Sequence, residues 1–219
     1  MQQNRAAISS MGHSKMMAIP FGRAFCALVF LSIASVSMSS AFAQASHSDN
    51  AQDYGAYSLN QDRSRILFKI GHFFVSSTEG KFSSFDGTLK FDPAAPEHGT
   101  VTIHVSPGSI VTDSAARDEH FRTADFFDVA RFPSAVFEST ALTRNSGKTG
   151  KLTGMLSLHG VSKPIGLDVT HLTPDPNADR QIFSATTTIK RSDFGMTNYL
   201  GVIGDDVTLT IEAEFDRVH

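Results

Sequence analysis

The segment "SAARDEHFRTADFF", residues 114–127, combines the side chains of this sequence that are best suited to chemistry. Asp118 and Glu119 are adjacent carboxylates, the residue type of general acid–base catalysis, but neighbours in sequence point in different directions on a helix. Asp125 and Asp128 can share a helix face, yet they fall at an expected helix end. Two interpretations therefore stay open: a catalytic cluster, or a lid that closes an apolar pocket and leaves a polar rim.

The same segment has the features of a short helix. Asp113 or Ser114 can cap its N-terminus. Phe121, Ala124 and Phe127 recur at helical spacing and form one apolar stripe. A helix with this stripe can plug the end of a barrel, and Arg117 beside it can bind an anionic or oxygen-bearing headgroup.

Other catalytic and metal-binding patterns are absent from the sequence. No histidine pair has the spacing of H-E-x-x-H, and no H-x-H lies on a strand, so a metal site would need residues brought together from afar. G-x-S-x-G is also absent. "SGKTG" has Leu142 where a phosphate-binding loop needs glycine, and it precedes a strand, which favours a hairpin turn. His72 follows Ile70 on the apolar face of its strand. It is either a core histidine or a polar group that faces a pocket.

Elsewhere apolar and polar residues alternate with period two, which is typical of half-buried β-strands. The clearest runs are "RILFKIGHF", "TVTIHVS", "KLTGMLSLHG" and "DDVTLTIEAEFDRV". The pattern predicts an all-β fold of about eight antiparallel strands with one helical excursion. Gly80 and Gly87 are expected to mark bends where strands curl. Closure into a barrel removes exposed edges, and eight strands enclose room for one slender ligand.

Residues 1–43 have the pattern of a secretory signal peptide. The apolar run "AFCALVFLSIASVSM" has about 15 residues, fewer than the roughly 18 to 20 of a transmembrane helix. "AFA" fits a cleavage site after Ala43, and an uncleaved anchor is the alternative. We therefore expect a flexible leader over 44–56 and one folded domain over 57–219.

The segment up to Ala43 contains three of the 19 basic residues and none of the 22 acidic ones. The remaining 16 basic and 22 acidic residues give a formal charge of −6, which argues against nucleic acid as a partner. The single cysteine, Cys26, also precedes the predicted cleavage site, so disulfides and thiol chemistry are excluded from the mature chain. Apolar burial must stabilise the fold, and the 18 phenylalanines are its main resource.

Four stretches together carry a family resemblance: "KIGHFFVSSTEGKFSSFDGTLKFDP", "RDEHFRTADFFDVARFPSAVFEST", "GMLSLHGVSKPIGLDV", and "KRSDFGM" with "GDDVTLTIEAE". Over essentially all of residues 57–216 the chain resembles the YceI-like family. The resemblance implies an extended, lipocalin-like β-barrel exported to the periplasm. It also implies binding of amphiphiles with long isoprenoid chains, such as polyprenyl phosphates or isoprenoid quinones. It implies no enzymatic activity, and no cofactor apart from such a bound lipid or quinone.

We expect the isoprenoid tail to lie along inward-facing residues and the headgroup to bind near His72 and Arg117. Met155 is expected to supply an adaptable wall. The family motifs also include Arg191 and Asp193, interpreted as a barrel-closing ion pair. The other expected ligand-binding residues are Phe68, Ile70, Phe82, Phe85, Asp118, Phe121, Phe127, Phe137, Leu156, Leu158 and Phe183.

Two other functions remain as alternatives at this point. One is a lipid-acting enzyme that uses His72 with Asp118 or Arg117. The other is an accessory protein of a membrane electron-transfer partner. A membrane protein and a second copy of this chain are therefore candidate partners, in addition to the isoprenoid lipid or quinone.

Overall fold

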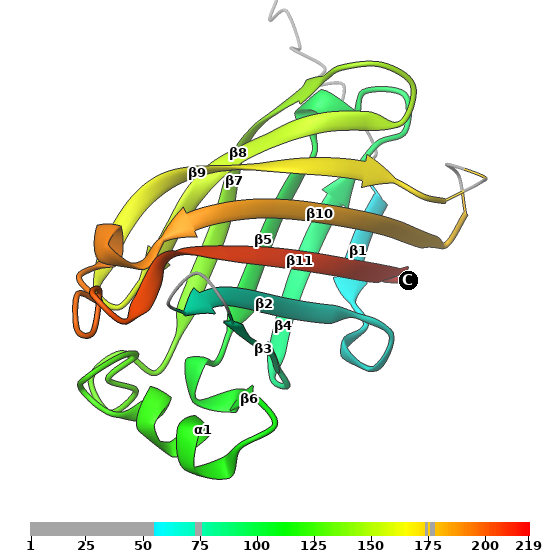
Figure 1. The fold of residues 1–219 in the computed structure, drawn as a ribbon. Helices are drawn as coiled ribbons and strands as arrows, with labels where there is room; N and C mark the ends of the chain where they lie inside the picture. Colours follow the sequence, from blue (N-terminus) through cyan, green and yellow to red (C-terminus); the bar gives the residue numbers. More distant parts are fainter. Residues whose placement is uncertain (1–54, 73–75, 174, 176–177) are drawn as a thin grey trace, which may run out of the picture. The chain divides into compact units, whose positions relative to one another are not determined.

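The computed structural model describes residues 55–72, 76–173, 175 and 178–219 (Figure 1). The predicted signal peptide and nearly all of the predicted leader lie outside these residues. Within them no helix is both long enough and apolar enough to cross a membrane. The strands are β1 Gly55–Leu59, β2 Arg65–His72, β3 Ser76–Phe82, β4 Phe85–Phe91, β5 Thr100–Val105, β6 Ile110–Val111, β7 Ala135–Arg144, β8 Thr149–Leu158, β9 Val161–His171, β10 Arg180–Lys190 and β11 Ile203–Arg217. The helices are α1 Ala115–Arg122 and the 3-10 turns η1 Gln61–Arg63, η2 Pro96–His98, η3 Pro107–Ser109 and η4 Arg191–Phe194.

The strands form an antiparallel barrel that closes on itself. Around the ring the order is β1-β4-β5-β7-β8-β9-β10-β11, and β11 pairs with β1 to complete the circle. The long strand β11 also pairs with β2, so β1 and β2 act as one strand interrupted by η1. Strands β3 and β4 likewise follow each other with a break of two residues, and β6 extends the β5 side by pairing with β3. This confirms the predicted all-β, eight-stranded closed barrel with one helix.

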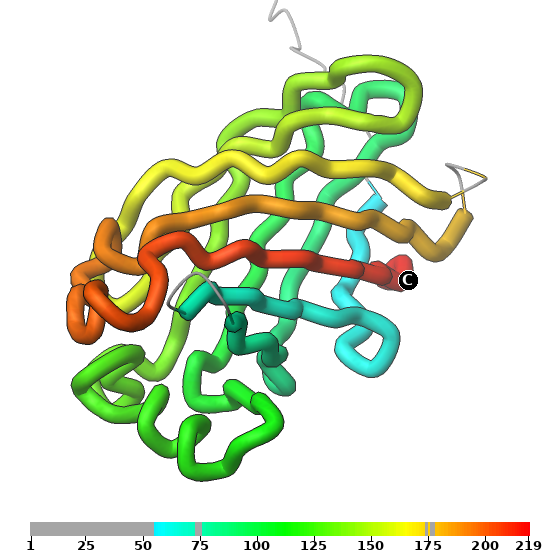
Figure 2. The backbone as a smooth tube through the Cα atoms, in the orientation of Figure 1, coloured from blue at the N-terminus to red at the C-terminus, as the bar shows by residue number. Residues whose placement is uncertain are grey.

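The barrel has two distinct ends (Figures 1 and 2). At one end lie the turn between β8 and β9, the segment between β10 and β11, and the cap, which we define as residues 112–134 with α1. At the other end, called the far end here, lie the turns between β7 and β8 and between β9 and β10. The cap connects β6 to β7, two strands that do not pair with each other.

Inward-facing glycines make room for phenylalanine rings. A Cβ on Gly80 would lie 2.7 Å from the ring of Phe68, its partner across β2 and β3. A Cβ on Gly154 would lie 2.5 Å from the ring of Phe137 and 2.4 Å from a backbone oxygen. The rings therefore cover the glycines and lie against the wall instead of filling the barrel axis. A Cβ on Gly80 would also lie 2.6 Å from the Val111 backbone oxygen, so the close approach of that backbone and of the Phe68 ring requires glycine there.

The helix in the cap is shorter than its apolar stripe predicted. Ser114 caps it, as expected, by accepting a hydrogen bond from the Arg117 backbone N–H at 3.4 Å. The helix ends at Arg122, and the chain then turns so that the Phe127 N–H donates to the Phe121 carbonyl at 3.0 Å. Because of this turn, Ala124 does not continue the stripe, and two consecutive phenylalanines at the end of the turn reach the barrel interior instead.

Candidate functional site: an apolar channel inside the barrel

Two adjoining cavities occupy the barrel interior. The first, the cap-side cavity, has a volume of about 140 Å³. Its wall is apolar except for Arg191. It is lined by Ile66, Phe68, Ile70, Phe82, Val105, Pro107, Ile110, Phe121, Phe126, Phe127, Ala135, Leu156, Leu158, Ile189, Arg191, Met196, Ile203, Val207 and Leu209.

The second, the central cavity, lies deeper in the barrel and has a volume of about 190 Å³. Its wall is mostly aliphatic and aromatic, with Phe85, Phe137, Leu167, Phe183 and Ala185 among the residues that line it. The two cavities share Ile66, Val105, Leu156 and Leu209, so no more than one layer of side chains separates them. Together they form one elongated apolar channel, and their volumes reach the lower end of the roughly 300–1,000 Å³ found for small-molecule sites.

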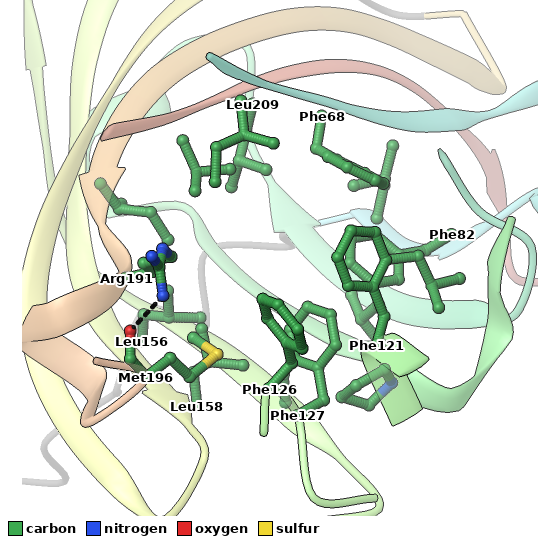
Figure 3. A pocket seen from close by; sticks show the side chains of 18 of the residues that line it. Phe68, Phe82, Phe121, Phe126, Phe127, Leu156, Leu158, Arg191, Met196 and Leu209 are labelled. Carbon is green, nitrogen blue, oxygen red and sulfur yellow. Dashed lines mark hydrogen bonds between the residues drawn. The ribbon is translucent and has the colours of Figure 1, made fainter. Parts of the chain in front are cut away.

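Phenylalanines from the cap form one wall of the cap-side cavity (Figure 3). The ring of Phe121 meets that of Phe68 edge-on, with centroids 6.4 Å apart, and the ring of Phe127 meets that of Phe82 at 5.9 Å. Phe126 packs edge-on against Phe121 at 5.0 Å. The phenylalanines of the cap therefore meet the barrel through ring contacts, which carry no fixed hydrogen-bond geometry and can rearrange around a ligand. Hydrogen bonds also hold the cap, because the Arg122 guanidinium donates to the carbonyls of Gly108 at 2.8 Å and of Ile110 at 3.1 Å.

Arg191 is the one charged residue of the cap-side cavity, and it is buried. Its guanidinium donates four hydrogen bonds of 2.7 to 3.1 Å to backbone carbonyls of Met196, Asn198, Ile203 and Gly204. Burial lowers the pKa of Arg191, while the nearby Asp205 carboxylate opposes that shift. Four of the five guanidinium N–H groups are thus committed to holding the segment between β10 and β11.

A polar contact also links the cap to that segment. The Asp125 carboxylate accepts hydrogen bonds from Tyr199 Oη at 3.1 Å and lies 2.9 Å from His120 Nε2. These hydrogen bonds hold the pKa of Asp125 below its usual value and raise the pKa of Tyr199. The ring of Tyr199 stacks on Phe126 at 5.8 Å, which places this contact directly above the cap-side cavity.

The structure brings most of the expected tail-binding residues to the channel. The cap-side cavity receives Phe68, Ile70, Phe82, Phe121, Phe127, Leu156 and Leu158, and the central cavity receives Phe85, Phe137, Leu156 and Phe183. The period-two pattern placed the strand residues on the inner face because alternate side chains of a strand point to opposite faces.

Four other expected residues do not line either cavity. His72 Nε2 lies 2.7 Å from Thr78 Oγ1, within the β2–β3 hairpin. Met155 falls between inward-facing residues of β8, so its side chain lies on the outer face. The remaining two are held in the cap.

The cap residues Arg117 and Asp118 have structural partners. Asp118 is buried and accepts hydrogen bonds from the Thr112 N–H at 2.9 Å and from Thr112 Oγ1 at 2.6 Å. Arg117 pairs with Asp113 and donates to Thr112 Oγ1 at 3.1 Å. The headgroup site expected at His72 and Arg117 is therefore not assembled, because both side chains face partners within the fold.

A further expectation, the ion pair between Arg191 and Asp193, is wrong. Asp193 accepts a hydrogen bond from Lys163 Nζ at 3.0 Å, on the outside of the barrel. Sequence reasoning also missed Phe126 and Met196 as wall residues. Phe126 follows the helix, so helical spacing gave no signal for it.

The comparisons with known proteins agree with this architecture. The family profile described as "YceI-like domain" matches residues 57–215. A "UPF0312 protein" of Azotobacter vinelandii is 38% identical over 152 residues, which covers 68% of this chain and 79% of that protein.

Two solved structures show the same fold. The YCEI protein of Campylobacter jejuni is 30% identical, with a TM-score of 0.60 over 68% of this chain and 90% of that chain. A polyisoprenoid binding domain from Saccharophagus degradans is 17% identical, with a TM-score of 0.57 over 75% of this chain and 99% of that domain. The profile match over nearly the whole barrel, together with these likenesses, shows that the chain belongs to the YceI-like family.

Proposed function

We propose that this protein binds an amphiphile with a long isoprenoid chain inside the channel and carries or stores it in the periplasm. The observation that supports this most directly is the pair of adjoining apolar cavities along the barrel interior. Each Å² of apolar chain removed from water there contributes about 25 cal/mol to binding. The name of the Saccharophagus degradans domain, which shares the fold, points to the same ligand class.

The walls favour a flexible, branched hydrocarbon. The cap-side cavity is lined by five phenylalanines and Met196, and the phenylalanines of the cap meet the barrel through apolar packing and ring contacts. The two volumes hold only part of a long isoprenoid chain, so we propose that Phe121 and its neighbours in the cap move aside to admit the rest. A polyprenyl phosphate or an isoprenoid quinone would both present such a chain.

A binding role, without catalysis, fits the polar groups near the channel. Arg191 is committed to backbone carbonyls, and Asp118 is committed to Thr112. The lumen-facing residues around Arg191 carry no nucleophile or acid–base pair among those described. We further propose export and cleavage after Ala43, on the signal-peptide pattern of residues 1–43.

The test is native mass spectrometry of the protein purified from the periplasm without detergent, followed by organic extraction. We expect one bound isoprenoid lipid or quinone per chain. Leu156→Asp places a carboxylate at the junction of the two cavities and should abolish binding, because burying an unpaired charge beside the chain is unfavourable. Met155→Asp, its neighbour on the outer face of β8, is the matched control and should retain the lipid. A folded Leu156→Asp variant that still binds lipid would refute the channel as the binding site.

A further inference from the structure

A third pocket lies at the far end of the barrel, away from the cap. This far-end pocket has a volume of about 240 Å³ and continues the channel, because it shares Phe91, Leu142, Val169 and Phe183 with the central cavity. Unlike the other two, it has a polar rim. It also shares Pro96 with the central cavity, and its other lining residues are Pro93, Arg144, Gly147, Lys148, Thr149, Gly150, His171 and Thr173.

The rim carries cationic and neutral donors and no carboxylate. Arg144 and Lys148 contribute positive charges, and no aspartate or glutamate lines the pocket. Lys148 Nζ donates to the Thr173 carbonyl at 3.1 Å, which holds the ammonium group over the pocket. The Lys148 carbonyl in turn accepts from the His171 backbone N–H at 2.8 Å and ties the β7–β8 turn to the end of β9.

Neither Arg144 nor Lys148 has a carboxylate within ion-pair distance anywhere in the described part of the chain, although acidic residues outnumber basic ones in the whole sequence. Four cations at the cap end, by contrast, have carboxylate partners. The ion pairs there are Arg117 with Asp113, Arg122 with Glu119, Arg131 with Asp128, and Lys163 with Asp193.

His171 adds a neutral polar group at the boundary between the channel and this rim. Its ring stacks on Phe183 at 4.8 Å and meets Phe91 edge-on at 5.3 Å. Gln181 donates through Nε2 to the Ala178 carbonyl, so its Oε1 accepts from His171 Nε2 at 2.8 Å. Nδ1 of the neutral ring is then an acceptor, and it donates to an anion only when the ring is protonated. Burial and the charge of Lys148 lower the pKa of His171, and a bound anion would act in the opposite direction.

We propose that the far-end pocket binds the anionic, phosphate-bearing headgroup of the amphiphile whose chain lies in the channel. This inference rests on the proposed function for the chain, and it assigns the headgroup end and its charge. Phosphate oxygens accept charge-assisted hydrogen bonds from guanidinium and ammonium groups. The apolar chain would then run from the aromatic collar of Phe91 and Phe183 through the central cavity toward the cap.

The test compares farnesyl diphosphate with farnesol, which has the same chain and no charge, by isothermal titration calorimetry. The variant is Arg144→Gln with Lys148→Gln. Its matched control is Arg65→Gln with Lys81→Gln, which removes the same charges from exposed positions on β2 and β3, outside the cap-side, central and far-end pockets. Because both rim cations are exposed, we expect the variant to lose about five- to tenfold in affinity for the diphosphate and little for farnesol. The control should bind both as the unmodified protein does.

Three other outcomes would overturn the headgroup assignment. The diphosphate preference could persist in the rim variant, or it could be lost only in Arg191→Gln, which would place the anion at the cap end. In addition, the protein could bind farnesol and farnesyl diphosphate equally. A protein that bound neither would refute the proposed function, and a titration with inorganic diphosphate, followed through the His171 ring resonances by NMR, would then decide the rim alone. Shifts that vanish in the rim variant would show a site for a free anion, and unshifted resonances would show none.

Discussion

We predict that a larger apolar side chain directed into the channel will stabilise the protein and weaken ligand binding at the same time. Ala185 is the best position for this experiment. It lies on β10, is 9% exposed, and lines the central cavity beside Phe137 and Leu167. Replacing Ala185 by leucine directs a larger apolar side chain into a void of about 190 Å³.

The magnitude follows from the carbon atoms that are added. Three more buried carbons contribute about 2.4 kcal/mol at roughly 0.8 kcal/mol each, and ordering the leucine side chain costs about 0.5–1 kcal/mol. We therefore expect Ala185→Leu to raise the free energy of unfolding by about 1.5 kcal/mol. The ligand loses a similar volume of the cavity, so its affinity should fall by about 2 kcal/mol, or roughly 30-fold.

Urea denaturation followed by circular dichroism measures the first effect, and calorimetric titration with farnesyl diphosphate measures the second. Thr186→Leu is the matched control, because Thr186 is the next residue of β10 and faces outward. It should change stability by less than about 0.5 kcal/mol and leave affinity unchanged. A loss of stability of more than about 1 kcal/mol in Ala185→Leu would show that the void is not available to a side chain. Unchanged affinity would show that the ligand does not reach the central cavity.

Three further predictions concern the wall, the far end and the cap. Gly154→Ala should lower the free energy of unfolding by about 1–3 kcal/mol, because the added Cβ would lie 2.4 Å from the Glu138 carbonyl oxygen. Gly71→Ala is the control and should change stability little, because no atom lies within 4 Å of its added Cβ. Urea denaturation of both variants measures the difference. Since burial lowers the pKa of His171, the unfolded chain binds its proton more readily, so its contribution to stability is present above about pH 6.5 and declines below it. Thermal unfolding from pH 8 to pH 5 should show a smaller decline in His171→Leu, and an identical decline would contradict the assignment. Asp118→Ala should cost about 1–3 kcal/mol of stability, because it leaves the partly buried Thr112 N–H without its acceptor, and Asp118→Asn should recover most of that loss in the same denaturation assay.

Much of the fold and of the channel wall could be predicted from the sequence. The alternation in "RILFKIGHF" placed Phe68 and Ile70 on the inner face, and both line the cap-side cavity. Alternation also put Leu156 and Leu158 inside, whereas Met155, which was expected in the wall, precedes Leu156 and lies on the outer face. These assignments depend only on the face of the strand to which each side chain points, and the local backbone determines that face.

The cap was harder to predict. Ser114, one of the two candidates for the helix cap, is the residue that caps the helix, and this signal was readable because it depends on a hydrogen bond to a residue three positions away. The inward position of Phe126 depends on a turn after Arg122 whose hydrogen bonds form only when the cap packs on the barrel. The helical stripe therefore failed at the point where the helix ends.

The placement of charge was decided by the tertiary structure alone. In the sequence, Arg117 lies in the same short segment as three phenylalanines and was expected to bind a headgroup, whereas Arg144 lies in an ordinary turn sequence. In the folded chain Arg117 is neutralised by Asp113, and Arg144 joins Lys148 and His171 at the mouth of an apolar channel. The sequence by itself determined the barrel and the apolar face of each strand, because these follow from local backbone geometry. Only tertiary structure decided where the interior stays empty and which cations remain unpaired, because both depend on distances between residues far apart in the chain.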